Sequence, residues 1–357
     1  MLLSDFDYEL PDHRIAQTPV EPRDSARLLV DRGGDPPDHR VVSDLPELLS
    51  EGDLLVVNET RVLPARLRLR RPSGGAAEVL LLEAVDDERR TWEALVRPGK
   101  RLRVGEELLA SDRAVVRIGE RTAAGDTFVV ELLGDDDPLV LLEQHGEMPL
   151  PPYIGTRLDD PERYQTVYAD EPASAAAPTA GLHFTTELLD RLGARGVGLA
   201  TVELVVGLDT FQPISTDDPL DHPMHTERYC VPAETLDAVA RARRVVAVGT
   251  TAVRALESAA ARGERAGRTD LFIHRGFDWQ VVDLLMTNFH LPRTTLLMMI
   301  DAFVGPRWRD LYATALASDY RFLSFGDAML LQRTPALPDP SDSVRSGLGR
   351  SGGRGQR

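Results

Sequence analysis

The chain has 357 residues, a length that fits about two domains, each long enough to bury a core of its own. Its 41 Lys and Arg residues against 57 Asp and Glu residues give a formal net charge of −16, which argues against a protein that coats nucleic acid but not against a local basic groove. The single cysteine, Cys230, excludes an internal disulfide and a multi-cysteine zinc site, and no apolar run is long enough for a membrane helix. We therefore expect a soluble, cytoplasmic protein without a membrane partner.

The first sixty residues predict strands of a buried sheet, and the residues after them have the composition of a different kind of domain. Residues 26–30 have the composition of a short strand, and the unbroken apolar run at 53–58 is typical of a strand buried on both faces. From Val62 to the proline cluster at 149–152, short segments rich in Val, Leu and Thr alternate with Gly, Pro or Asp turns, which indicates a small antiparallel barrel or sandwich. These segments lie at 77–85, 91–97, 113–119 and 127–133.

After Tyr153 strands and helices alternate, which is typical of an α/β domain. The sequence thus predicts a discontinuous α/β domain, residues 1–61 and 151–333, interrupted by an inserted small antiparallel β-barrel domain at 62–150. Residues 334–357 hold Pro, Ser, Gly and Arg with almost no apolar residues and predict a disordered basic tail. The elements expected in the second half are strands at 197–207 and 244–248 and helices at 233–243, 250–262, 295–303 and 308–317.

Pro178–Thr185 is a loop that leads into a predicted helix, with Thr185 as its N-cap. The loop places His183 just before the helix N-terminus, where the helix dipole disfavours the charged imidazole. This arrangement suits anion binding or a general base. A capping loop with a structural histidine would show the same pattern, and the residues alone leave both interpretations open.

A second histidine-rich segment, Asp221–Glu227, could bind a metal ion or supply an acid–base pair. His222, His225 and Glu227 are ligand types for a divalent cation, but Pro223 separates the two histidines and the helical metalloprotease spacing is absent. Alternate residues of an extended chain share a face, so His225 and Glu227 could also act together as acid and base.

Two further turns follow predicted strands. Gly249–Thr251, before a helix that carries Arg254, can present N–H groups to a phosphate or a carboxylate, although a tight turn between a strand and a helix has the same composition. Asn288 and His290 flank an aromatic residue and could bind a purine, although an Asn turn before Pro292 would look the same.

The densest run of cations begins where the apolar strand ends. From Arg61 to Arg71 there are five arginines and no acid, and they follow Asn58 at a strand end of the kind where α/β sheets bind ligands. The run could follow the phosphate backbone of a nucleic acid, or it could be the solvated surface of the barrel.

Eight motifs, each weak alone, follow one another along the chain and cover nearly everything except the tail. They are Asp5–Pro11, Glu21–Leu28, Asn58–Val62, Pro178–Thr185, Met224–Glu227, Gly249–Thr251 with Arg254, Thr287–Pro292, and Tyr320–Phe322 with Gly326–Met329. Together they resemble the S-adenosylmethionine:tRNA ribosyltransferase-isomerase family of queuosine biosynthesis. Two segments depart from the pattern. Val205 and Asp209 stand where members of the family usually have His and Gly, and Arg275 stands where Pro usually precedes a Gly-aromatic pair.

The resemblance implies an unusual reaction. S-adenosylmethionine would donate its ribosyl moiety rather than a methyl group, and no metal would be needed. The acceptor would be the aminomethyl group of a deazaguanine base at the wobble position of tRNA, and the products would be epoxyqueuosine-tRNA, adenine and methionine. Several proton transfers would require groups with a pKa near neutral, such as histidine. We expect a monomer that binds the tRNA anticodon loop.

The same resemblance implies roles for the candidate residues. His183 and His225 would move protons, with Glu227 orienting His225, and Asn288 and His290 would hold the adenine. The remaining candidates would bind other parts of the cosubstrate, namely Thr179, Gly181, Gly249, Thr250, Thr251 and Arg254, or the RNA and its acceptor base, namely Arg23, Asp24, Asn58, Arg61, Arg66 and Arg68.

Three other functions stay open at this point. An S-adenosylmethionine-dependent methyltransferase would use the same cosubstrate, but the GxGxxG motif that would support it does not follow the first strand. A non-catalytic tRNA-binding relative would fit the changes at Val205 and Asp209. A metal hydrolase would depend on His222 and His225.

Overall fold

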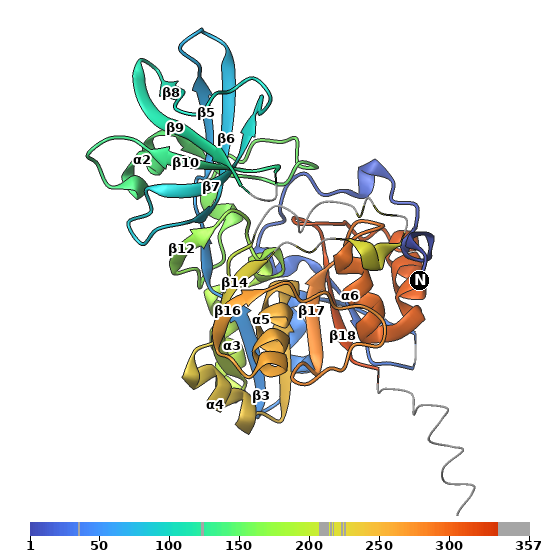
Figure 1. Cartoon of the computed structure of the whole chain (residues 1–357). Coiled ribbons are helices and arrows are strands. Elements are labelled where there is room, and N and C mark those ends of the chain that lie inside the picture. Colours follow the sequence, from blue (N-terminus) through green and yellow to red (C-terminus); the bar gives the residue numbers. More distant parts are fainter. Residues whose placement is uncertain are drawn as a thin grey trace, which may run out of the picture.

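The structure is a computed structural model that describes residues 1–34, 36–122, 125–206, 214, 216, 218–222, 224 and 226–334. Within them the chain forms one large sheet and one small barrel (Figure 1). The large sheet has nine strands in the order β16-β14-β13-β3-β15-β17-β18-β1-β2. Its strands are β1 (Arg27–Asp31), β2 (Asp38–Val41), β3 (Asp53–Asn58), β13 (Gly198–Leu204), β14 (Glu227–Cys230), β15 (Arg244–Val248), β16 (Ala266–Thr269), β17 (Leu284–Asn288) and β18 (Ala328–Gln332).

Four neighbouring strands in the middle of the sheet, β13, β3, β15 and β17, run parallel to one another. Alternate residues of β3 enter two different cores, with Leu54 and Val56 in one cluster and Leu55 and Val57 in the other. Because both faces of this strand are covered, the run at 53–58 is apolar without a break, as a central parallel strand requires.

The four parallel strands end along one edge of the sheet. Their last residues are Leu204, Asn58, Val248 and Asn288. Polar turns follow three of these ends, and they are the turns that the sequence marked. The carboxyl edge of such a sheet is where α/β proteins bind their ligands.

Helices cover both faces of the sheet. The long helix α5 packs on β13, β3, β15 and β17, and α6 and α7 join the same core. On the other face α3 supplies Leu188 and Leu192, and the oxygen of Thr185 caps this helix by accepting from the Leu188 N–H at 3.1 Å, as predicted. The predicted helices are present within two residues of their expected ends. The helices are α1 (Leu45–Leu48), α3 (Thr186–Ala194), α4 (Ala233–Arg241), α5 (Gly249–Arg262), α6 (Thr295–Val304) and α7 (Trp308–Ala317).

The barrel is closed and has its own core. Strands β5-β6-β7-β10-β9-β8 are neighbours in that order, and β8 pairs back onto β5 through Leu109 and Arg70. Its apolar residues form a cluster separate from those of the large sheet. The predicted fold class, an α/β domain with a small antiparallel barrel, is therefore confirmed. The elements are β5 (Arg66–Arg70), β6 (Ala76–Ala84), β7 (Thr91–Arg97), β8 (Glu107–Ala110), β9 (Arg113–Arg121), β10 (Phe128–Leu132), α2 (Pro138–His145) and β11 (Gly146–Glu147).

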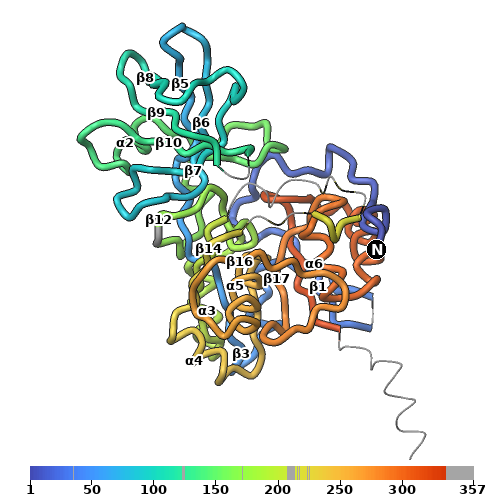
Figure 2. Tube along the Cα trace, viewed as in Figure 1, coloured from blue at the N-terminus to red at the C-terminus, as the bar shows by residue number. Residues whose placement is uncertain are grey.

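The barrel stands beyond the carboxyl edge of the large sheet (Figure 2). The chain leaves β3 through β4 (Thr60–Val62), enters the barrel at β5, and later returns through β12 (Glu171–Ser174), which pairs with β4. The domain boundaries stay a prediction, and the tail beyond Thr334 lies outside the described residues. No helix in the described part of the chain is long and apolar enough to cross a membrane.

Candidate active site

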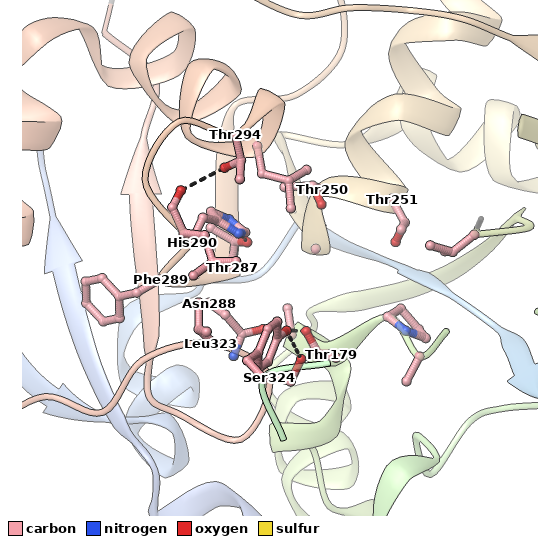
Figure 3. Close-up of a pocket in the computed structure, with 18 residues that line it drawn as sticks. Thr179, Thr250, Thr251, Thr287, Asn288, Phe289, His290, Thr294, Leu323 and Ser324 are labelled. Atoms are coloured by element: carbon pink, nitrogen blue, oxygen red, sulfur yellow. Dashed lines mark hydrogen bonds between the residues drawn. The ribbon is translucent and has the colours of Figure 1, made fainter. Parts of the chain in front are cut away.

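A pocket of about 610 Å³ opens at the carboxyl edge of the parallel strands (Figure 3). It collects residues from the turns after β13, β15 and β17, from the loop before α3, and from two segments that we did not predict. No Asp, Glu, Lys or Arg is among its described lining residues. They are Tyr153, Ala177, Pro178, Thr179, Ala180, Val206, Gly249, Thr250, Thr251, Thr287, Asn288, Phe289, His290, Leu291, Thr294, Leu296, Leu323 and Ser324.

The N-terminus of α5 forms one wall of this pocket. Gly249, the first residue of the helix, has φ +86°, which a residue with a side chain rarely adopts. The next two residues, Thr250 and Thr251, are each 7% exposed and line the pocket. The Thr251 Oγ1 atom is buried and has no hydrogen-bond partner within the described residues. An unsatisfied hydroxyl beside a helix N-terminus is suited to an anionic group of a ligand.

A chain of hydrogen bonds fixes the opposite wall. The Thr179 hydroxyl donates to Asn288 Oδ1 at 2.9 Å, which turns Asn288 Nδ2 toward His183 Nε2 at 3.3 Å. An amide nitrogen can only donate, so Nε2 accepts and the imidazole is neutral with its proton on Nδ1. Asn288 and Thr179 line the pocket, and His183 lies one contact behind them.

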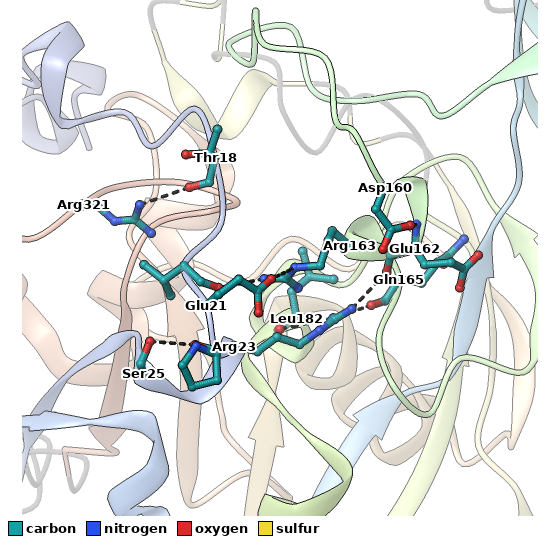
Figure 4. A network of polar contacts seen from close by, with 12 residues as sticks. Thr18, Glu21, Arg23, Ser25, Asp160, Glu162, Arg163, Gln165, Leu182 and Arg321 are labelled. Carbon is teal, nitrogen blue, oxygen red and sulfur yellow. Dashed lines mark hydrogen bonds and ion pairs between the residues drawn. The ribbon is translucent and has the colours of Figure 1, made fainter.

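The surroundings of His183 keep it uncharged. Burial and then the positive charges of Arg321, Arg163 and Arg23 lower the pKa of His183 to about 4. Figure 4 shows the polar network around these arginines, in which Arg23 donates to the carbonyls of Gln165 at 2.6 Å and of Leu182, the residue before His183, at 3.4 Å. The loop that carries His183 is therefore tied to the N-terminal segment.

His290 lies on the pocket wall and is held from two sides. Its Nε2 is 3.0 Å from the Thr287 hydroxyl, and burial lowers its pKa to about 3. Its backbone is clamped between two tyrosines, because the Tyr8 hydroxyl donates to His290 O at 2.5 Å and the His290 N–H donates to the Tyr312 hydroxyl at 3.0 Å. Both pocket-side histidines are thus neutral near pH 7.

Glu227 and Arg254 form a buried ion pair with each other. Each is less than a tenth exposed, and Arg254 also reaches Thr269 O at 3.5 Å. Neither residue lines the pocket. Our expectation that Arg254 binds a ligand carboxylate is therefore not supported, since its charge is already neutralised by Glu227. His225, which we expected Glu227 to orient, lies outside the described residues.

Two other predicted ligand residues serve the fold. Asn58 is fully buried, its Nδ2 donates to Leu204 O at 3.0 Å, and its Oδ1 accepts from the Leu204 N–H at 3.2 Å, so it fastens β3 to β13 and leaves no atom for RNA. Gly181 lies so close to Tyr168 that a Cβ atom would stand 2.0 Å from the tyrosine hydroxyl oxygen. Asp24 follows Arg23 in a short 3-10 turn.

A much larger groove, with a volume of about 2420 Å³ that includes open solvent, runs between the barrel and the α/β domain. It contains Arg61, Arg66 and Arg68 as predicted, but these arginines are not a bare cationic run. Arg61 pairs with Glu162 at 2.6 Å, and Arg68 pairs with Glu147 at 2.9 Å. The charged residues that line the groove are balanced, namely Arg61, Arg66, Arg68 and Arg157 against Glu143, Glu147, Asp159 and Glu162.

Comparison with known proteins decides the family. The family model described as "Queuosine biosynthesis protein" matches residues 3–331. The chain belongs to this family. It is 51% identical over 349 residues to the S-adenosylmethionine:tRNA ribosyltransferase-isomerase of Symbiobacterium thermophilum, covering 93% of this chain and 100% of that one. The protein of the same name from Carboxydothermus hydrogenoformans is 50% identical over 341 residues, with 93% and 100% covered.

A solved structure is also similar to this chain. The crystal structure of S-adenosylmethionine tRNA ribosyltransferase from Thermotoga maritima is 38% identical, with a TM-score of 0.52 over 91% of this chain and 99% of that chain. The family expected from the eight motifs is confirmed, and so is its class, a transferase-isomerase.

Two of the residues that depart from the motif pattern of the queuosine family are Val205 and Asp209. Val205 is buried, and its N–H donates to Arg228 O at 2.9 Å, while its neighbour Val206 lines the pocket. Asp209 lies outside the described residues. Among the residues that the structure describes, no group of three or more His, Cys, Asp or Glu could hold a metal ion.

Several residues that line the pocket were not predicted from the sequence. Tyr153 follows the proline cluster at 149–152, which we interpreted only as a domain boundary. Ser324 lies just after the Tyr320–Phe322 motif and does not belong to it. Leu323 has φ +67°, a strained conformation for a leucine, which marks a constrained loop at the pocket wall. A positive φ at a non-glycine residue leaves no sign in the sequence, so this signal could not have been found there.

Proposed function

We propose that the chain transfers and isomerises the ribosyl moiety of S-adenosylmethionine onto the aminomethyl-deazaguanine base at the wobble position of tRNA, with release of adenine and methionine. The observation that supports this most is the convergence of Asn288, His290 and the N-terminus of α5 in one pocket whose described lining residues include no Asp, Glu, Lys or Arg. The names of the relatives point to the same substrates. We also propose that the protein works as a cytoplasmic monomer on the anticodon loop.

The pocket fits the two ends of S-adenosylmethionine. The methionine carboxylate is anionic and would lie at the α5 N-terminus, where N–H groups and the free Thr251 hydroxyl can bind it. The adenine carries donors and acceptors and would lie beside Asn288 and His290, whereas the Phe289 ring between them is buried in the core and is not available to stack on it (Figure 3).

The histidines of the pocket act differently in this proposal. His183 does not line the pocket, so we assign it as a positioning residue that holds the Asn288 amide in one orientation. His290 lines the pocket in its neutral form and could donate to or accept from the departing adenine. His225 stays our candidate for the base that removes the proton next to the sulfonium.

The test follows the fate of the cosubstrate. Purified protein is incubated with S-adenosylmethionine and tRNA that carries the precursor base, and both the small molecules and the tRNA nucleosides are analysed by mass spectrometry. The proposal expects free adenine, methionine and epoxyqueuosine in equal amounts. S-adenosylhomocysteine and a methylated nucleoside would instead show a methyltransferase, and no product at all would favour a tRNA-binding relative.

A matched pair of variants tests the carboxylate site. Thr251→Val removes the hydroxyl at nearly constant volume, and Thr251→Ser keeps it. Loss of a hydrogen bond to a charged group costs about 1.5–3 kcal/mol, or roughly 10- to 150-fold in affinity. We expect Thr251→Val to raise the KM for S-adenosylmethionine by about that factor, while Thr251→Ser stays near the wild type. Equal KM values for the two variants would contradict the placement of the carboxylate.

A further inference from the structure

The active-site pocket and the groove are separated by one short stretch of chain. Tyr153 lines the pocket, whereas its neighbours Pro152 and Ile154 line the groove. The stretch belongs to the segment by which the chain returns from the barrel to the α/β domain. A group that moves from the groove to the pocket along this stretch would meet the Tyr153 side chain.

Tyr153 is fixed at both its side chain and its backbone. Its hydroxyl is 2.8 Å from the Ser324 hydroxyl, which lies on the pocket wall. The amide of Gln17 donates to Tyr153 O at 2.9 Å and accepts from the Gly155 N–H at 2.9 Å, so one side chain holds the stretch at two points. Tyr153 is a partly exposed residue that packs against the edges of two core clusters. A rigid aromatic ring whose position is set in advance is a surface on which a planar group can stack at low entropic cost.

The described charged side chains of the groove are balanced, but exposed arginines among them can exchange a carboxylate partner for a phosphate. The groove is wide, and Arg61, Arg66 and Arg68 lie along it. Arg68 and its partner Glu147 are each more than half exposed, so their ion pair is weak and a phosphate can replace the carboxylate. Arg61 and Glu162 are also substantially exposed. RNA phosphates in the groove would place a loop nucleotide next to Tyr153.

We propose that Tyr153 is the platform on which the target base of the RNA stacks as it enters the pocket from the groove. This inference rests on the proposed function, because it requires RNA as the substrate. A base that leaves its own stack needs a new aromatic surface, and single-stranded bases are commonly bound in this way. Removing such a platform weakens binding by about 10-fold or more.

The experiment measures binding of a synthetic anticodon stem-loop with guanine at the wobble position, by fluorescence anisotropy, to the full chain. The variants are Tyr153→Leu, which removes the ring, and Tyr153→Phe, which keeps the ring and removes the contact with Ser324. The same RNA with an abasic wobble position is the second arm. We expect Tyr153→Leu to weaken binding of the intact RNA about 10-fold or more and of the abasic RNA less than 2-fold, and Tyr153→Phe to stay near the wild type with both.

The two-arm design separates stacking from folding. If Tyr153 only supports the fold or the groove, Tyr153→Leu should lose affinity for the intact and the abasic RNA to the same extent. Equal losses with the two RNAs would therefore overturn the inference. Equal losses in Tyr153→Phe and Tyr153→Leu would overturn it too, because they would assign the effect to the hydroxyl. Under turnover, the KM for tRNA should rise in Tyr153→Leu and stay near the wild type in Tyr153→Phe. Wild-type protein that binds the RNA but releases no adenine would refute the proposed function, not this stacking site.

Discussion

The contact between Asn288 and His183 can be tested by placing a charge in it. In Asn288→Asp a carboxylate oxygen stands where the amide nitrogen now lies, 3.3 Å from His183 Nε2. Two unit charges at that distance interact by about 5 kcal/mol at an effective dielectric constant of about 20, which is about 3–4 pKa units. The pKa of His183, now lowered to about 4, should therefore rise to about 7–8 in this variant.

The assay is a pH titration of histidine ring protons by NMR. The chain has 8 histidines, and the signal of His183 is assigned by its loss in His183→Gln. Asn288→Ala serves as the control, since it removes the amide without adding charge, and its shift should be less than about 1 unit. If the titration of His183 is the same in Asn288→Asp and in the wild type while the rest of the spectrum is unchanged, the two side chains are not in contact and the account of this wall is wrong.

Three further results are expected, each measured by urea unfolding. Gly181→Ala should lose about 1–3 kcal/mol because its new methyl group meets the Tyr168 hydroxyl, and Tyr168→Phe in the same chain should restore part of the loss. Glu227→Gln should cost about 3–5 kcal/mol by leaving the buried Arg254 charge unpaired, and adding Arg254→Met should recover stability; no recovery would refute the pairing. The pKa of His183 is lowered from an ordinary 6.5 to about 4, so the unfolded chain takes up the proton first as the pH falls. The free energy of unfolding should therefore decrease by roughly 3 kcal/mol between about pH 6.5 and pH 4. His183→Gln should show a correspondingly smaller decrease.

The fold could be predicted where one residue pattern decides the environment. The run at 53–58 indicated a strand covered on both faces, and its residues do alternate between two cores. Short barrel strands were visible from their turns. The edge strands β2 and β16, and β14 next to β16, were not predicted, because short and partly polar segments become strands only when a neighbouring strand supplies their hydrogen bonds.

The site was predicted in part, and the errors have a common cause. Thr179, Asn288 and His290 do meet in one pocket, since strand ends in a parallel sheet must share an edge. Charge pairing was misjudged, because the partners of charged residues come from distant segments. The carboxylates that neutralise Arg61 and Arg68 are supplied by residues 79 or more positions away in the sequence. No local pattern records such a partner.

The measurement that tests the central claim most directly is a crystal structure of the protein with S-adenosylmethionine bound. The account predicts difference density for the adenine ring against Asn288 and His290, and for the methionine carboxylate at the N–H groups of Thr250 and Thr251. Density for the nucleoside in the groove beside Arg61 and Arg68, with the pocket empty, would contradict it.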